Sequence, residues 1–100
     1  MIDAGSINEI KPGKMKRVAL ENGQHILVCN VDGQFHAVDD RCTHEDASLY
    51  LGCLKGDRVQ CSLHGGMFNV RTGEPAEEPA EIALKTWPVQ IVDDRIMITI

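Results

Sequence analysis

The sequence has few aromatic residues and no long hydrophobic run. Only four aromatic residues occur among its 100 residues, and no stretch approaches the eighteen apolar residues of a membrane-spanning helix. Leu, Ile and Val dominate the apolar residues, which is typical of an ordinary globular chain. Residues 1–6 contain neither the basic nor the apolar region of a signal peptide. We therefore expect a soluble cytoplasmic protein that does not associate with membranes.

Excess positive charge is also lacking. The net charge of -5 would repel the phosphates of a nucleic acid, so we expect no nucleic-acid partner and favour protein partners. A chain of 100 residues makes one domain and has no room for a second catalytic domain. We expect a single domain over residues 1–100 that acts as a monomer.

The sequence also lacks helical periodicity, because no stretch of ten residues shows a convincing helical repeat of apolar residues. Alternating or β-branched runs between turn signals instead predict strands at residues 15–20, 24–31, 34–38, 58–60, 67–70, 86–92 and 95–100. The Asn22-Gly23 and Asp32-Gly33 turns should join the first three of these strands into an antiparallel meander. The sequence therefore predicts an all-β protein.

Two features of the C-terminal third complete this prediction. Residues 74–81 contain four glutamates and two prolines, which predicts a surface loop rather than a strand or a helix. Ile96, Ile98 and Ile100 alternate with more polar residues, which predicts that the last strand is half-buried and forms a final hairpin.

The chemistry of the chain is concentrated in two short motifs, Cys42-Thr43-His44 and Cys61-Ser62-Leu63-His64, which are sixteen residues apart. Thiolate sulfur and imidazole nitrogen together indicate a transition metal. A zinc finger would pair its cysteines with each other and its histidines with each other. Here each motif combines one cysteine with one histidine.

This arrangement resembles the signature of Rieske iron-sulfur proteins, in which two histidines replace two cysteines on one iron of a 2Fe-2S cluster. Flanking residues extend the resemblance over nearly the whole chain: residues 33–38, Ser48-Leu49, residues 65–69 and residues 71–73. The resemblance is closest to the small soluble Rieske ferredoxins of multicomponent aromatic-ring-hydroxylating dioxygenases.

The resemblance implies one Rieske-type 2Fe-2S cluster, with Cys42 and Cys61 on the inner iron and His44 and His64 on the outer iron. It also implies antiparallel sheets with a small cluster-binding tip, formed by two loops within residues 40–70. Two ferric ions, two sulfides and two thiolates sum to zero charge, so an added electron is accepted more easily than with four thiolates.

The function implied is that of a one-electron carrier rather than an enzyme. Such a protein takes electrons from a flavin-dependent ferredoxin reductase and passes them to a terminal oxygenase, docking transiently with each. Its exposed end, including Glu45, Asp46 and Leu63, would be the docking face.

Four positions depart from the high-potential respiratory Rieske proteins. Ala47 and Leu63 occupy the positions of two cysteines that form a disulfide there, so that bridge is not possible here. Gly66 and Phe68 replace a serine and a tyrosine whose hydroxyls donate hydrogen bonds to cluster sulfur. We therefore expect a reduction potential near the bottom of the Rieske range.

The remaining cysteines and histidines are expected to have structural roles. Cys29 and Cys53 should be small buried thiols without a disulfide between them. His25 and His36 lie on expected strands with no cysteine nearby, and we interpret both as structural or solvent-facing.

Two alternatives stay open on the sequence alone. An oxygenase with two histidines and one carboxylate on a mononuclear iron would need His25 and His36 to meet. A redox sensor, or a Rieske-type small subunit of another reductase, would share the cluster motif and differ only in its partner.

Overall fold

The computed structural model describes residues 1–43, 47–63, 65–78 and 80–100. The described chain is built from antiparallel strands and one short 3-10 helix, and no described helix is long and apolar enough to cross a membrane. The strands are β1 (Ile2–Ser6), β2 (Met15–Ala19), β3 (His25–Val31), β4 (Gln34–Asp39), β5 (Cys53–Lys55), β6 (Arg58–Gln60), β7 (Met67–Asn69), β8 (Pro75–Glu77), β9 (Thr86–Trp87), β10 (Val89–Val92) and β11 (Arg95–Ile98), and the helix is η1 (Leu49–Leu51). The all-β prediction is confirmed.

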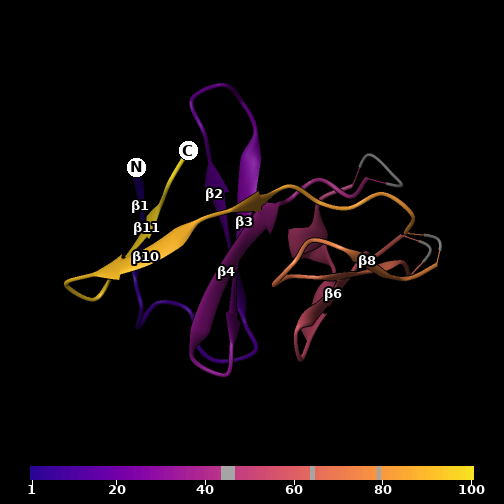
Figure 1. Ribbon diagram of the computed structural model, residues 1–100, viewed down its shortest axis with the longest axis horizontal. Coiled ribbons are helices and arrows are strands. Elements are labelled where there is room, and N and C mark those ends of the chain that lie inside the picture. The colour runs from indigo at the N-terminus through magenta and orange to yellow at the C-terminus, as the bar shows by residue number, and fades with distance from the viewer. Residues whose placement is uncertain (44–46, 64, 79) are drawn as a thin grey trace.

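Three sheets follow one another along the long axis of the molecule (Figure 1). The terminal sheet has the order β1-β11-β10, the central sheet β2-β3-β4-β9, and the small sheet β5-β6-β7-β8. Both chain termini lie at the terminal sheet, and the small sheet occupies the opposite end (Figure 1).

The central sheet contains the meander predicted from the sequence. β2 pairs with β3 and β3 with β4, both antiparallel. Asp32 and Gly33 both have positive φ, 50° and 88°, as a type I′ turn requires, so the Asp-Gly signal is confirmed as a two-residue hairpin turn. β2 is an edge strand, and its Lys16 and Arg17 protect that edge with charge.

The terminal sheet differs from the prediction in its first strand. Residues 15–20 are not the first strand, because β1 precedes them and pairs with β11 through Ile2 and Ile98. Only contact with the other end of the chain makes this short segment a strand. The final hairpin of β10 and β11 is confirmed, but of its three alternating isoleucines Ile100 is exposed.

The small sheet contains two strands that were not predicted. β5 lies in a segment for which no strand was predicted, and β8 lies in residues 74–81, which were expected to be a loop. Composition was misleading there because Pro75 begins an edge strand, where a missing N–H is tolerated. Residues 58–60 and 67–70 form the predicted strand pair β6 and β7, to within one residue.

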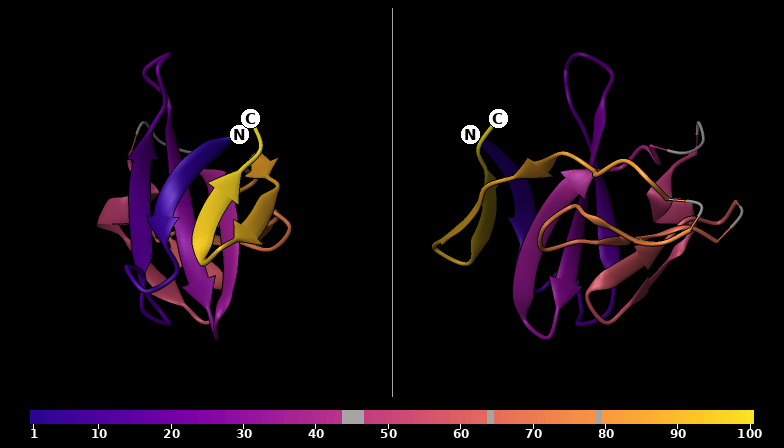
Figure 2. Two further views of the ribbon diagram at one scale, coloured as in Figure 1. Left: turned by 90° about the vertical axis from the view of Figure 1, so that its left-hand side faces the viewer. Right: turned by 45° about the vertical axis from the view of Figure 1, so that its right-hand side comes forward.

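Residues 86–92 form two strands rather than one. Pro88 separates β9, which pairs with β4, from β10, which pairs with β11. Because proline fixes φ and has no N–H, the chain can leave one sheet and enter the next at this position. This segment connects the central and terminal sheets, as Figure 2 shows from two sides.

The central sheet is buried on both faces, which divides the hydrophobic core in two. Alternate residues of a strand point to opposite faces. In β3, Ile26 and Val28 therefore pack with residues of the terminal sheet, whereas Leu27, Cys29 and Val31 pack toward the small sheet. The cluster on the small-sheet side includes Cys42 and Cys61.

Gly52 permits a close approach between the segment after η1 and strand β6. A Cβ atom on Gly52 would lie 1.8 Å from the carbonyl oxygen of Gln60, although the φ of Gly52, -86°, is open to any residue. The constraint is therefore steric, and it acts one residue before Cys61.

We expect Gly52→Ala to lower the free energy of unfolding by about 3 kcal/mol, because the backbone of β6 would have to move. Gly56→Ala in the β5–β6 turn is the matched control. Its Cβ would meet nothing within 4 Å, and only its positive φ of 62° is unfavourable, at a cost of about 1 kcal/mol. Urea unfolding of both variants measures the difference, and equal losses would contradict the steric argument.

Candidate metal centre

The first motif, residues 42–47, follows strand β4, and Asp40 holds its two ends together. The Asp40 carbonyl accepts the N–H of Leu49 at 2.6 Å, Arg41 and Ser48 form an antiparallel bridge, and the Cys42 N–H donates to the Ala47 carbonyl at 2.9 Å. These three successive links bring the chain before the motif against the chain after it.

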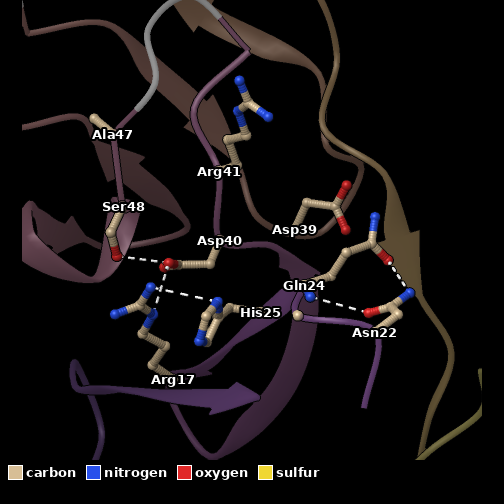
Figure 3. A pocket seen from close by; sticks show the side chains of 10 residues that line it. Arg17, Asn22, Gln24, His25, Asp39, Asp40, Arg41, Ala47 and Ser48 are labelled. Carbon is tan, nitrogen blue, oxygen red and sulfur yellow. Dashed lines mark hydrogen bonds and ion pairs between the residues drawn. The ribbon is translucent and has the colours of Figure 1, made fainter. Parts of the chain in front are cut away.

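The Asp40 side chain reinforces this closure. It is buried, at 2% exposure, and its Oδ2 accepts the Ser48 hydroxyl at 2.5 Å while its Oδ1 accepts the Tyr50 N–H at 2.9 Å. Arg17 of β2 contacts Oδ2 through Nε at 3.1 Å. The carboxylate thus joins the central sheet to the chain on the far side of the first motif (Figure 3).

The second motif, residues 61–66, connects β6 to β7 and has the same closure. The Cys61 N–H donates to the Gly66 carbonyl at 2.8 Å, and the Gly65 N–H donates to the Leu63 carbonyl at 2.8 Å. Gly65 has a φ of +75°, and its carbonyl also accepts the Gln60 side-chain amide at 3.3 Å. In each motif the cysteine N–H therefore bonds five residues ahead.

Both motif cysteines are buried in the same hydrophobic cluster. Cys42 and Cys61 are each 2% exposed, and Leu49, Val59 and Phe68 belong to the cluster with them. Two thiols brought from separate motifs into one apolar site fit a metal cluster that is ligated by two cysteines. His44 and His64, like Glu45 and Asp46, lie outside the described residues.

A crossing segment, residues 80–85, supports the first motif and the strands beside it. The Thr43 hydroxyl donates to the Ile82 carbonyl at 2.6 Å, and the Leu84 N–H donates to the Gly73 carbonyl at 2.7 Å. The Asp39 N–H in turn donates to the Lys85 carbonyl at 2.9 Å. The crossing segment is therefore attached to the first motif, to the turn after β7 and to β4.

The two remaining histidines do not form a second metal site among the described residues. His25 in β3 lies 3.4 Å from an Arg17 guanidinium nitrogen through Nδ1. His36 in β4 is half-buried, its Nε2 has no hydrogen-bond partner among the described residues, and burial, followed by the charge of Arg71, lowers its pKa. Within the described ranges no three His, Cys, Asp or Glu side chains gather, so the mononuclear iron alternative gains no support.

The structure corrects the prediction for one of the two other cysteines. Cys29 is fully buried, as expected, but Cys53 is exposed and its thiol lies 3.7 Å from the Gln60 side-chain oxygen. Both thiols are free in the structure. Cys53 begins β5, an edge strand of the small sheet that was not predicted, and its side chain lies on the exposed face of that strand.

Sequence reasoning missed two features of the site. Asp40 was not singled out, although an acidic residue two positions before the first motif cysteine was a visible signal. The exposed apolar side chains of Tyr50, Leu51 and Ile82 were also missed. Ile82 carries a weak signal, because it follows the polar residues 74–81 directly.

We expect iodoacetamide at pH 8 to modify Cys53 and not Cys29 in the native protein. Burial, followed by the negative charge of Asp40, raises the pKa of Cys29 to about 12, so roughly one thiol in ten thousand is ionised at this pH. Peptide mapping by mass spectrometry identifies the modified residue, and Cys53→Ser is the control that should remove the label. Labelling of Cys29 in the native state would contradict its burial.

The comparison with known proteins agrees with this site. Residues 1–88 match the family described as Rieske [2Fe-2S] domain. The ferredoxin CarAc of Metapseudomonas resinovorans is 37% identical over 91 residues, covering 91% of this chain and 85% of that protein. The biphenyl dioxygenase ferredoxin subunit of Pseudomonas sp. (strain KKS102) is 44% identical over 89 residues, covering 88% and 81%.

Among solved structures, one chain from the complex of reduced oxygenase and oxidized ferredoxin in carbazole 1,9a-dioxygenase superimposes with a TM-score of 0.95. It shares 35% identity, and the match covers 97% of this chain and 90% of that chain. The match extends over all three sheets rather than over the two motifs alone. The chain therefore belongs to the Rieske [2Fe-2S] domain family and carries one Rieske-type 2Fe-2S cluster.

Proposed function

We propose that this protein is the ferredoxin component of an aromatic-ring dioxygenase system, a one-electron carrier between a flavin-dependent reductase and a terminal oxygenase. The observation that carries the proposal is the pair of closed motifs, whose cysteines are buried together on the small-sheet side of the core. Relatives that match most of the chain are themselves named as ferredoxin components of dioxygenase systems.

The proposed ligands are Cys42 and Cys61 on the inner iron and His44 and His64 on the outer iron, within a single domain of residues 1–100 whose cluster-binding portion is about 40–70. The bound cluster supplies a site that accepts and releases one electron. The two buried thiolates hold the inner iron in a dry apolar environment, and the chain supplies no hydroxyl at Gly66 or Phe68. This supports a potential near the bottom of the Rieske range.

We expect Cys42→Ser to lose the cluster and much of its stability, because ligation and folding are coupled. Iron and sulfide analysis, with an EPR spectrum of the reduced protein, measures the loss. Cys53→Ser is the matched control and should keep full iron content, because Cys53 lies outside both motifs. A Cys42→Ser protein that keeps a normal Rieske signal would refute the proposed ligand set.

The proposed docking surface is the apolar edge around the two motifs. It consists of exposed side chains at the small-sheet end: Tyr50 (44% exposed), Leu51 (71%), Leu63 (46%) and Ile82 (66%). An apolar centre of this kind suits a small, transient redox interface, and the net charge of -5 favours partners with basic rims. The protein would act as a cytoplasmic monomer and bind its reductase and its oxygenase in turn.

The docking surface is tested by Leu51→Ser combined with Ile82→Ser. We expect the dissociation constant of the oxygenase complex to rise about tenfold, since each truncated interface side chain costs about 0.7 kcal/mol or more. The reduction potential should stay unchanged. Stopped-flow oxidation of the reduced protein at several oxygenase concentrations gives the constant.

Ile91→Ser combined with Val92→Ser provides the matched control, because both residues are exposed on β10 at the opposite end. This pair should bind as tightly as the unchanged protein. If both double variants raised the dissociation constant equally, the proposed location of the docking surface at the small-sheet end would be wrong. The same assay separates this function from that of a small subunit of another reductase, because only the correct partner oxidises the protein at a useful rate.

A further inference from the structure

We propose that Asp40 is a positioning residue for the cluster, and that the Arg17–Asp40 ion pair tunes the reduction potential. The inference rests on the ligand set proposed above. According to this inference, two residues outside both motifs affect the reduction potential of the cluster.

Asp40 is placed to act on the centre through the backbone. It stands two residues before Cys42, so their Cα atoms are at most about 7 Å apart. Its side chain contacts Ser48 and Tyr50, which follow the first motif directly. Any change at this carboxylate therefore reaches both ends of the segment that contains Cys42 and His44.

The charge of Asp40 is only partly compensated. Its side chain is 3% exposed, whereas that of Arg17 is 41% exposed, so solvent screens the positive charge more than the negative one. The Arg17 guanidinium is held in place by a second contact, to His25 Nδ1 (Figure 3). The pair as a whole thus presents a net negative field toward the interior.

The same charge acts on another thiol of the core. Burial, and after it the charge of Asp40, raises the pKa of the Cys29 thiol, because a second negative charge near Asp40 is unfavourable. Cys29 belongs to the same hydrophobic cluster as Cys42 and Cys61. Adding an electron to a cluster held by those cysteines also adds negative charge there, so Asp40 opposes reduction and Arg17 favours it.

The test measures the reduction potential of Asp40→Asn and Arg17→Gln by protein-film voltammetry. We expect Asp40→Asn to raise the reduction potential, so that the ratio of reduced to oxidised protein at a fixed mediator potential increases at least threefold. At about 59 mV per tenfold, this change equals about 28 mV. Arg17→Gln should shift it the opposite way, because Asp40 then lacks its counter-charge. The double variant should lie between the two. A purely structural role would not give shifts of opposite sign.

Asp39→Asn is the matched control. It removes the same charge from the adjacent residue, whose side chain points away from the first motif (Figure 3). The Asp39 carboxylate instead accepts the Trp87 indole N–H at 2.9 Å. The proposal is overturned if Asp40→Asn shifts the potential no more than Asp39→Asn does, or if Arg17→Gln raises or leaves unchanged the potential.

Iron content and the EPR spectrum of each variant keep the test decisive. If Asp40→Asn does not hold a cluster, Arg17→Gln alone decides the proposal, because it leaves the Asp40 contacts with Ser48 and Tyr50 in place. If the protein without substitutions shows no Rieske EPR signal, the proposed ligand set is refuted instead. Failure of the ligand set is therefore distinguishable from failure of the proposal for Asp40 and Arg17.

Discussion

The burial of β3 on both faces is the constraint on which the rest of the structure depends. All but the first of its seven residues are buried, which leaves no face of this strand for solvent. A short antiparallel sheet can have one wet face, but this one needs a cover on each side. The terminal sheet provides one cover, and the small sheet with the two motifs provides the other.

This constraint links the metal centre to the stability of the fold. Cys42 and Cys61 belong to the cover on one side of β3, in contact with the same cluster as Leu27 and Val38. A polar or charged group at the cysteine positions would need to be compensated in an apolar interior. With Cys42 and Cys61 as the proposed ligands, iron would compensate the two thiolates. The 2Fe-2S cluster would then complete a core that the small sheet, with strands of three residues, closes only in part.

Local patterns were enough to predict the parts of the fold whose pairing is local. The Asp32-Gly33 turn and the apolar run of β3 identified the meander, and the alternation of Ile96 and Ile98 identified the final hairpin. β1 could not be found in this way, because its partner β11 lies some ninety residues further along the chain and its own sequence shows little alternation. Pro75 was assigned to a loop and Pro88 to the middle of a single strand, but Pro75 begins an edge strand and Pro88 moves the chain between two sheets.

For the site, the sequence was sufficient to predict the 2Fe-2S cluster, because cysteine and histidine pairs at this spacing are specific, whereas the four ligands stay a prediction. It could not identify Asp40, whose role depends on Ser48 and Tyr50 folding back against it, or Ile82, which the Thr43 hydroxyl brings to the first motif. Cys53 was assigned to the interior from the usual behaviour of its residue type. Its exposure follows from a strand that only pairing with β6 creates.

The position of the two termini has a practical consequence. Both ends of the chain lie at the terminal sheet, with the small sheet at the other end of the long axis (Figure 1). A tag or a tether attached at either end would therefore leave the apolar edge around the motifs uncovered. Such a protein could be anchored to an electrode surface through one of its ends, with the proposed docking surface facing the solution.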